Sequence, residues 1–376
     1  MIESFEFHRE LERNGLRFFT GVPDSLLKDL CAYITDHVLP QDHVINANEG
    51  AAVALAAGYH LATGNIGVVY MQNSGLGNAV NPLLSLADRG VYAVPMLLII
   101  GWRGEPDVSD EPQHQVQGRR MTPMLEAMGV PYEVIGPDTS IADAAATVGR
   151  LAERARAEGR PVALVVRKGT FAPYPEPPAK RRAFTRADAV ACVLDALSPD
   201  DVVVSTTGMT SREVFAYRER RGQGHDRDFL TVGSMGHASQ IALGLTGAGR
   251  PVVCLDGDGA LIMHMGSLAI IGSQQPANLW HVVINNAAHD SVGGQPTAAG
   301  KIDLSAIARA CGYQSADTVS RAEEAAAAVR RLRGEPGPGF LEIRVDSQPH
   351  TDAGRPTTAP QGNKAALMRA LGSDRG

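Results

Sequence analysis

The chain has 376 residues, of which 44% are hydrophobic and 20% charged, and its 35 basic and 41 acidic side chains leave a formal net charge of −6. A chain of this length and apolar content can bury a sizeable core and is long enough for two domains. The mildly acidic balance, without a long basic block, argues against nucleic acid or an anionic membrane surface as a partner.

Short apolar segments alternate with Ala-rich helical stretches along most of the chain. Residues 1–10 mix acidic and apolar side chains, so we expect no secretory signal and a cytoplasmic protein. The longest apolar run, residues 91–100, is too short to span a bilayer and is typical of a buried strand. Further strands are expected at residues 66–71, 96–100, 162–166, 201–206, 251–256, 281–285 and 340–345. Because these runs are β-branched and uninterrupted, they predict strands covered on both faces, as in parallel sheets built from βαβ units.

Residues 171–182 interrupt this alternation with four prolines and a basic cluster. Such a stretch predicts an extended connector, stiffened by proline, between two compact units. We therefore expect an α/β protein with one domain at residues 1–170, a proline-rich linker at 171–184 and a second domain at 185–376.

The four cysteines are far apart in the sequence, and they are Cys31, Cys192, Cys254 and Cys311. They form no CxxC pair and have no neighbouring histidine at the spacing of a zinc site. We interpret them as structural thiols.

A second apolar stretch is bracketed by polar motifs, GDG at residues 257–259 and NN at residues 285–286. The run 251–256 predicts a strand and residues 260–272 predict a helix, so GDG should form a tight turn between them. Glycines allow close approach of the backbone, and a helix N-terminus attracts an anion such as a diphosphate. Asp258 and an asparagine amide offer the oxygen ligands that Mg²⁺ prefers, and Mg²⁺ often links a carboxylate to diphosphate oxygens. The two motifs therefore predict a diphosphate–magnesium site.

This spacing, GDG followed by 25 residues and then NN, resembles the thiamine diphosphate signature of the decarboxylase superfamily. An ordinary turn and strand is the alternative for GDG taken alone. The resemblance implies that Asp258, Asn286 and the backbone carbonyl of Ala288 bind Mg²⁺. It also implies two thiamine diphosphate-binding-fold domains, pyrimidine-binding at 1–170 and diphosphate-binding at 185–376, each a mostly parallel sheet flanked by helices.

Other cofactor positions follow from the same resemblance. Met235, in residues 232–236, matches the bulky residue that bends the cofactor, although a methionine can also simply fill a core gap. Thr207, in residues 205–211, matches a loop that grips the diphosphate, although threonine before glycine is also a common turn former. Further cofactor contacts are expected at Gly233, Gly259, Ala260 and Ser291.

Glu49 precedes an Ala-rich helical pattern within residues 46–64. A glutamate at the start of a helix is usually a solvated residue that stabilises the helix dipole. The resemblance gives Glu49 a different role, as the catalytic acid that hydrogen-bonds the pyrimidine ring of the cofactor from the pyrimidine-binding domain.

We expect no third domain between these two, unlike in many members of the superfamily. The short form resembles the phosphonopyruvate decarboxylase family over nearly the whole chain, most distinctively at residues 21–28, 70–86, 101–118 and 289–297. Sulfopyruvate decarboxylases are close relatives, often split into two chains that correspond to these halves. The resemblance implies decarboxylation of 3-phosphonopyruvate to phosphonoacetaldehyde and carbon dioxide, dependent on thiamine diphosphate and Mg²⁺, in phosphonate and antibiotic biosynthesis.

A substrate that carries a carboxylate and a phosphonate requires cationic groups and hydrogen-bond donors. Candidate substrate residues are Ser25, Asn73, Arg103, His114 and His289. Asp24, His114 and His289 are also candidate catalytic groups, and Asp24 would relay protons or discourage rebinding of a carboxylate. Taken alone, a loop arginine is usually solvated and a histidine is usually structural. His264, inside the helix expected after GDG, is interpreted as a packing residue.

Several alternatives stay open. Sulfopyruvate or another 2-oxo acid could be the substrate, because sulfonate and phosphonate are tetrahedral anions of similar reach. A catalytically silent thiamine-fold subunit is disfavoured by the presence of Glu49, Asp258 and Asn286 together. A nicotinamide dehydrogenase is weaker still, because the glycine run at 75–80 lacks a third glycine. The resemblance further implies a homodimer or larger homo-oligomer with active sites at the subunit interface.

Overall fold

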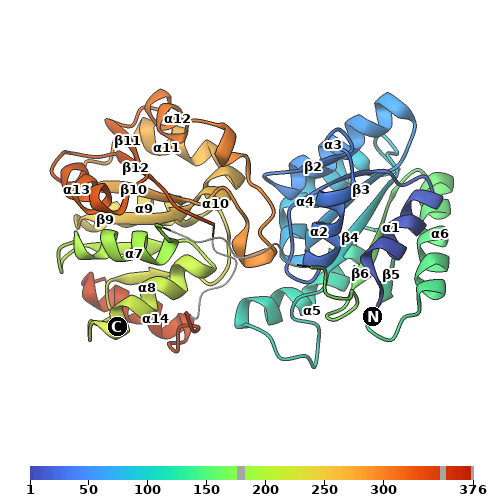
Figure 1. Cartoon of the computed structure of the whole chain (residues 1–376), viewed down its shortest axis with the longest axis horizontal. Coiled ribbons are helices and arrows are strands. Elements are labelled where there is room, and N and C mark those ends of the chain that lie inside the picture. The colour runs from blue at the N-terminus through green and yellow to red at the C-terminus, as the bar shows by residue number, and fades with distance from the viewer. Residues whose placement is uncertain (176–182, 348–352, 374–376) are drawn as a thin grey trace. The chain divides into compact units, whose positions relative to one another are not determined.

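The computed structural model of the chain describes residues 1–175, 183–347 and 353–373. The chain forms two compact units, Met1–Pro178 and Ala179–Gly376 (Figure 1). Each unit contains one six-stranded sheet in which every pairing is parallel, with helices on both faces. The predicted α/β class with two parallel-sheet domains is confirmed. Of the expected linker, residues 176–182 lie outside the described residues.

The first unit alternates strands with helices. Its strands are β1 (Phe18–Gly21), β2 (His43–Ile45), β3 (Gly67–Gln72), β4 (Met96–Gly101), β5 (Tyr132–Ile135) and β6 (Pro161–Val166). Its helices are α1 (Ser4–Arg13), α2 (Lys28–His37), α3 (Glu49–Thr63), α4 (Leu76–Pro82), α5 (Pro112–Ala127) and α6 (Ile141–Glu158), with short helical turns at Asn73–Gly75 and Leu83–Ala87. The strand order is β2-β1-β3-β4-β6-β5.

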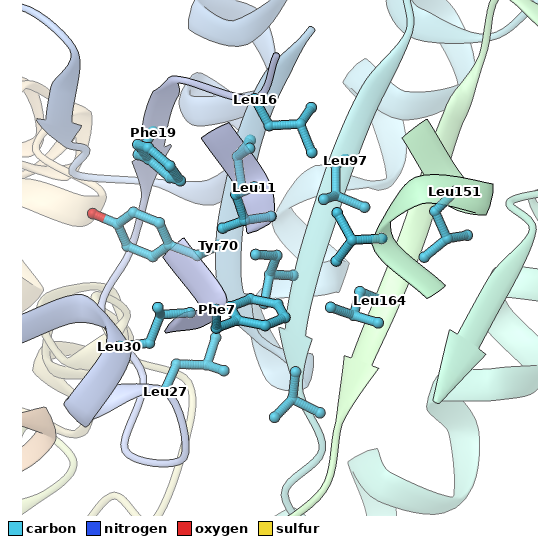
Figure 2. Close-up of a cluster of buried hydrophobic side chains, with 14 of the residues drawn as sticks. Phe7, Leu11, Leu16, Phe19, Leu27, Leu30, Tyr70, Leu97, Leu151 and Leu164 are labelled. Carbon is cyan, nitrogen blue, oxygen red and sulfur yellow. The ribbon is translucent and has the colours of Figure 1, made fainter. Parts of the chain in front are cut away.

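Two apolar cores enclose this first sheet, one on each face. Successive side chains of a strand point to opposite faces, so each strand contributes to both cores. On one face Phe7, Leu11 and Leu30, from α1 and α2, lie in the same cluster as Leu97 and Leu164 of the sheet, together with residues of α6 (Figure 2). The other face is covered by α3, α4 and α5. This double burial explains why the strands read as continuous apolar runs rather than alternating ones.

The second unit repeats the same plan. Its strands are β7 (Val202–Ser205), β8 (Asp228–Leu230), β9 (Val252–Gly257), β10 (Leu279–Asn285), β11 (Ser315–Val319) and β12 (Gly339–Arg344). Its helices are α7 (Arg186–Asp195), α8 (Met209–Arg220), α9 (Ala238–Leu245), α10 (Asp258–Met263), α11 (Gly266–Gln274), α12 (Leu304–Ala310), α13 (Ala322–Arg333) and α14 (Pro360–Ala370), with short helical turns at Thr246–Ala248, Asp290–Val292 and Ala298–Lys301. Helices α7, α8 and α13 cover one face, and α9 to α12 with α14 cover the other.

The strand order of the second sheet, β11-β12-β10-β9-β7-β8, matches that of the first, strand for strand. In each unit the first strand lies between the next two strands of the chain, β1 between β2 and β3 and β7 between β8 and β9. Ligands of open parallel sheets bind outside the carboxyl ends of the strands at such a switch point. The loops that follow these strands are therefore where a site is expected.

Three features differ from the sequence-based expectation. The apolar run 91–100 begins in a turn with Tyr92 exposed, and the strand starts only at Met96. The helix expected over 260–272 is interrupted at His264, whose φ of −132° and ψ of 47° are not helical. The short strands β1, β2, β5, β8 and β11 were not expected. Across the described residues, no helix is both long enough and apolar enough to span a bilayer.

Candidate functional site

Polar side chains follow four neighbouring strands of the first sheet. Asp24 follows β1, Glu49 follows β2, Asn73 follows β3 and Arg103 follows β4. Because the strands are parallel and adjacent, these side chains come from loops at a single edge of the sheet. Predicted residues that lie up to 79 positions apart in the chain are thus gathered at the switch point of the first unit.

Glu49 is the first residue of α3 and is buried, with 5% of its surface exposed. The preceding residue, Asn48, caps the helix, and its side chain accepts a hydrogen bond from the Gly50 N–H at 2.8 Å. The Glu49 Oε2 atom accepts a hydrogen bond from Asn78 Nδ2 at 2.8 Å. Burial raises the pKa of Glu49, and the hydrogen bond from Asn78 opposes that rise. Glu49 is therefore not a solvated residue at a helix start.

Gly75 packs against the second oxygen of this carboxyl group. A Cβ atom on Gly75 would lie 2.1 Å from Glu49 Oε1, a distance that no real contact allows. Any side chain at position 75 would therefore displace the acid. Gly75 lies in the distinctive stretch 70–86, but the sequence did not identify it as a site residue.

Arg103 lies at the centre of a second polar group in this unit. Its guanidinium donates to both oxygens of Asp110, at 2.7 and 2.6 Å, and to Ser25 Oγ at 2.8 Å. Asn73 Nδ2 donates to the Arg103 carbonyl at 2.8 Å, and the Arg103 N–H donates to Asn73 Oδ1 at 3.2 Å. The structure thus brings the predicted residues Ser25, Asn73 and Arg103 together and adds Asp110, which the sequence analysis missed.

The Asp110 carboxylate is held in its ionised form. Burial opposes ionisation of Asp110, but the hydrogen bonds and charge of Arg103 and the Glu111 N–H together outweigh it and keep the pKa of Asp110 below its usual range. His114, on α5, also favours the charged form of Asp110. The His114 carbonyl packs against the loop, because a Cβ on Gly104 would lie 1.9 Å from it. His114 is therefore in the electrostatic surroundings of the Arg103–Asp110 pair.

Asp24 is fully buried. Its Oδ2 atom accepts a hydrogen bond from the Leu26 N–H at 3.1 Å, and a Cβ on Gly101 would lie 1.9 Å from the same oxygen. The Oδ1 atom has no hydrogen-bond partner among the described residues. Burial raises the pKa of Asp24 to about 6, and the nearby Arg103 charge opposes this rise. A carboxyl group that titrates near neutrality is suited to proton exchange.

The second unit places its predicted residues after β7, β8, β9 and β10, which are neighbours in the sheet. Gly257 is the last residue of β9 and Asp258 is the first residue of α10, so no residue separates strand from helix. The Asp258 carboxylate is buried, and its Oδ2 atom accepts a hydrogen bond from Thr297 Oγ1 at 2.5 Å. Burial raises the pKa of Asp258 to about 6, and Asp290 adds to the rise.

Asn286 follows β10 and is hydrogen-bonded at both ends of its amide. Its Nδ2 atom donates to Asp290 Oδ2 at 2.6 Å, and the Ala288 N–H donates to its Oδ1 atom at 3.2 Å. Asp290 Oδ2 also accepts from Arg186 Nη1 at 3.1 Å, and Arg186 Nε donates to Glu213 Oε2 at 2.9 Å. Arg186, Glu213 and Asp290 are all buried, and none of the three was identified from the sequence.

Met235 and His289 converge on the turn that carries Asp258. A Cβ on Gly259 would lie 3.0 Å from His289 Cε1 and 3.4 Å from Met235 Cε. Burial lowers the pKa of His289 to about 4, so its imidazole is neutral near pH 7. Ala260 is buried in the first turn of α10, whereas Gly233 is half-buried in the loop that precedes Met235.

The loop after β7 contributes hydroxyl groups. Thr206 is buried, and its Oγ1 atom has no hydrogen-bond partner among the described residues, whereas the predicted Thr207 beside it is half-buried. Thr206 lies near the GDG turn, since a Cβ on Gly257 would be 3.8 Å from its Cγ2 atom. Ser291 is close to the same loop, because a Cβ on Gly208 would be 4.0 Å from its Oγ.

His264 ends α10 and packs against Gly236, where a Cβ would lie 2.5 Å from its Cδ2 atom. Its ring also contacts the His237 ring, with centroids 4.4 Å apart. These contacts fit the packing role expected for His264, at a break between two helices rather than inside one helix.

One cysteine has a histidine neighbour that its sequence spacing did not reveal. The register of β9 and β10 pairs Cys254 with His281, and both lie with Asp256 in a buried group whose ligand atoms are within 4.8 Å of one another. His281 is hydrogen-bonded to Asp256 Oδ2 at 3.3 Å and to the Tyr313 hydroxyl at 3.2 Å. Burial raises the pKa of Cys254 well above its usual value, which keeps the thiol protonated. We interpret this group as a hydrogen-bonded part of the core.

The second unit fits a cation and a diphosphate. Asp258 is a buried acid with no ion-pair partner in the described part of the chain, so a divalent cation would compensate its charge. The Asn286 amide oxygen and the Ala288 carbonyl oxygen are ligands of the kind that Mg²⁺ prefers. The unpartnered Thr206 hydroxyl beside Gly257 is available to a phosphate oxygen.

Comparisons with known proteins agree with the two-domain α/β fold. Residues 6–129 match the family described as thiamine pyrophosphate enzyme, N-terminal TPP binding domain, and residues 206–343 match the corresponding C-terminal TPP binding domain. Over 363 residues the chain is 34% identical to a phosphonopyruvate decarboxylase of Streptomyces viridochromogenes, covering 92% of this chain and 89% of that protein. A phosphonopyruvate decarboxylase of Streptomyces hygroscopicus is 33% identical, with 96% and 92% covered. A sulfopyruvate decarboxylase of Methanosarcina acetivorans is 26% identical, with 89% and 88% covered.

Proposed function

The chain belongs to the thiamine pyrophosphate enzymes, within the phosphonopyruvate decarboxylase family of carbon–carbon lyases, and from this premise we propose that it decarboxylates 3-phosphonopyruvate with thiamine diphosphate and Mg²⁺. The products would be phosphonoacetaldehyde and carbon dioxide, and the setting phosphonate and antibiotic biosynthesis. The observation that carries the cofactor assignment is that the buried Asp258, which has no ion-pair partner among the described residues, follows β9, while Asn286 follows the adjacent strand β10.

Three oxygen atoms would hold the metal, from the Asp258 carboxylate, the Asn286 amide and the Ala288 carbonyl. The diphosphate would be bound by the loop after β7, where the structure favours the Thr206 hydroxyl in addition to the predicted Thr207. Ser291, Gly233, Gly259 and Ala260 would complete these contacts, with Met235 against the middle of the cofactor. When bound, thiamine diphosphate supplies the electron sink that decarboxylation of a 2-oxo acid requires.

Glu49 would hold the pyrimidine ring through its carboxyl group. Asn78 occupies its Oε2 atom, so Oε1 is the oxygen assigned to the cofactor. The raised pKa of Glu49 favours a shared proton at this contact.

Replacing a carboxylate by hydrogen at the substrate carbon consumes one proton. Asp24 is suited to supply it, since its Oδ1 atom is unpartnered in the described chain and its pKa is raised to about 6 by burial. His114 and His289 are further candidates for this transfer.

The substrate anions would be bound by the group around Arg103. Asn73 and Ser25 fix the Arg103 backbone and guanidinium, and Asp110 sets the plane of the guanidinium. We propose that this group, with His114 and His289, recognises the phosphonate and carboxylate of the substrate.

We further propose a homo-oligomer in which each active site takes Glu49 from one subunit and Asp258 from another, as the family resemblance implies. A dimer of this kind would carry two equivalent sites related by its two-fold axis.

A second candidate substrate is sulfopyruvate, favoured by the 26% identity to a sulfopyruvate decarboxylase along 89% of this chain. The test is the ratio of kcat/KM for phosphonopyruvate, sulfopyruvate and pyruvate, measured by aldehyde release with thiamine diphosphate and Mg²⁺ present. We expect phosphonopyruvate to exceed each competitor by about 10-fold or more. A preference for sulfopyruvate or pyruvate would overturn the substrate assignment and leave the lyase class intact.

A further inference from the structure

The amide of Asn286 has two ends of similar shape and opposite chemistry. An ionised carboxylate only accepts hydrogen bonds, so the end that faces Asp290 Oδ2 at 2.6 Å must be the NH₂ group. The oxygen is therefore at the far end, where the Ala288 N–H donates to it at 3.2 Å. An amide oxygen has two lone pairs, and this hydrogen bond uses one of them. The other lone pair is available to a cation.

Asp290 is itself fixed by further contacts. Its Oδ2 atom accepts from Arg186 Nη1 at 3.1 Å, and its Oδ1 atom accepts from Ser347 Oγ at 2.7 Å. Arg186 is held in turn by Glu213, at 2.9 Å. The side chains of Arg186, Glu213 and Asp290 are 8%, 3% and 2% exposed, so water does not compete for the hydrogen bonds among these three. Rotation of the Asp290 carboxylate would break its own hydrogen bonds to Arg186, Ser347 and Asn286 together.

We propose that Asp290 is a positioning residue for the metal site, and that its carboxylate orients the Asn286 amide so that Oδ1 rather than Nδ2 faces the cation. The inference rests on the proposed function, because it concerns the Mg²⁺ that accompanies thiamine diphosphate. If the amide turned over, an N–H group would face the cation, and a ligand would be replaced by a repelling donor. Outer-sphere partners of this kind typically contribute about 10- to 100-fold to metal affinity.

The first test removes the carboxylate and keeps its shape. In Asp290→Asn, the new amide can donate or accept, so Asn286 is no longer held in one orientation. The variant is titrated calorimetrically with thiamine diphosphate at a series of Mg²⁺ concentrations. Half-maximal binding should require at least about 10-fold more Mg²⁺ than in the wild type. The matched control is Asp201→Asn, which changes another buried aspartate paired with an arginine, Arg333, just before β7, and should keep the wild-type Mg²⁺ requirement.

The second test exchanges the two side chains. In the double variant N286D/D290N, the amide at position 290 donates to the carboxylate at position 286, whose other oxygen then faces the metal. The double variant should need at least about 3-fold less Mg²⁺ than N286D alone, in which two carboxylates face each other, and less than D290N if that variant folds. A role of Asp290 confined to holding Arg186 predicts no such rescue, because asparagine at 290 is uncharged.

The outcomes separate this inference from the proposed function. If the wild type does not bind thiamine diphosphate in a Mg²⁺-dependent way, the proposed function is wrong. If the wild type binds and D290N has the same Mg²⁺ requirement, Asp290 does not orient Asn286. If the exchange variant binds no better than N286D, the inference is also wrong, whether or not D290N folds.

Discussion

The Oε1 atom of Glu49 lies 2.1 Å from the position that a Cβ on Gly75 would occupy. The carboxyl group is thus confined between Gly75 on one side and the Asn78 amide, at 2.8 Å, on the other. This confinement limits the directions in which the buried carboxyl group of Glu49 can turn.

Adding one methyl group at Gly75 should therefore impair catalysis more than folding. Gly75 has an ordinary φ of −74°, so Gly75→Ala creates no backbone strain, and its main effect is displacement of Glu49. We expect kcat to fall by about 100-fold, as for misplacement of a catalytic group by about 1 Å. Gly77→Ala is the matched control, because its Cβ would meet nothing within 4 Å. Equal kcat values for the two variants would show that the position of Glu49 does not limit the reaction.

The buried Asp24 predicts a pH-dependent stability difference. Its folded pKa of about 6 is above the ordinary 3.8, so folding favours the protonated form. That contribution is fully present below about pH 4 and is lost as the pH rises through 6. Asp24→Asn should therefore gain roughly 3 kcal/mol of unfolding free energy relative to wild type between about pH 4 and pH 7. Because asparagine cannot donate the proton proposed to come from Asp24, the decarboxylation rate of Asp24→Asn should be lower than that of wild type over the same pH range.

Urea unfolding at intervals of pH measures this gain. The exposed Asp226 provides the control, because Asp226→Asn should run parallel to wild type at every pH. If the difference in unfolding free energy between Asp24→Asn and wild type does not change with pH, the pKa of Asp24 is not raised.

Thr297 is predicted to support the metal site through its 2.5 Å hydrogen bond to Asp258. Thr297→Val keeps the shape of the side chain and loses the hydroxyl, so cofactor binding should require about 10-fold more Mg²⁺. Thr297→Ser keeps the hydroxyl and should stay close to wild type. Both are measured by calorimetry, and an equal loss in the two variants would assign the effect to packing.

Mixing two inactive variants tests where the active site is assembled. In a mixture of Glu49→Ala and Asp258→Ala chains with subunit exchange, about half of the dimers should be mixed, and each of these should carry one intact and one doubly damaged site. Activity should recover to roughly a quarter of wild type per total site. If native mass spectrometry shows exchange and activity stays at background, Glu49 and Asp258 do not act together across subunits.

The sequence predicted the apolar strands well, because β3, β4, β6, β9, β10 and β12 are buried on both faces. It missed β2, for example, because His43–Ile45 is a three-residue strand that is only half-buried. The turn that begins residues 91–100 escaped detection because Tyr92 is apolar in type but exposed, and hydropathy does not report exposure.

Only part of the candidate site could be predicted from the sequence. Asp258 and Asn286 follow strands that the sequence marks clearly, so their position at one sheet edge was predictable. Thr297 and Arg186 were not, since they reach Asp258 and Asp290 across 39 and 104 positions of the chain. Asp110 was hidden in the same way, because nothing in its local sequence shows that it pairs with Arg103 rather than with water. Such contacts arise only when the chain is folded.

Phosphorus NMR of a single reaction tests the central claim most directly. Purified protein is mixed with 3-phosphonopyruvate, thiamine diphosphate and Mg²⁺, and parallel samples omit the cofactor or the metal or contain Glu49→Gln. We predict that the phosphonopyruvate signal is replaced by that of phosphonoacetaldehyde, with one carbon dioxide released per molecule, only in the complete wild-type sample. The Glu49→Gln sample should be slower by about 100-fold or more. Conversion that proceeds equally without thiamine diphosphate, or no conversion of phosphonopyruvate in the complete sample, would contradict the account.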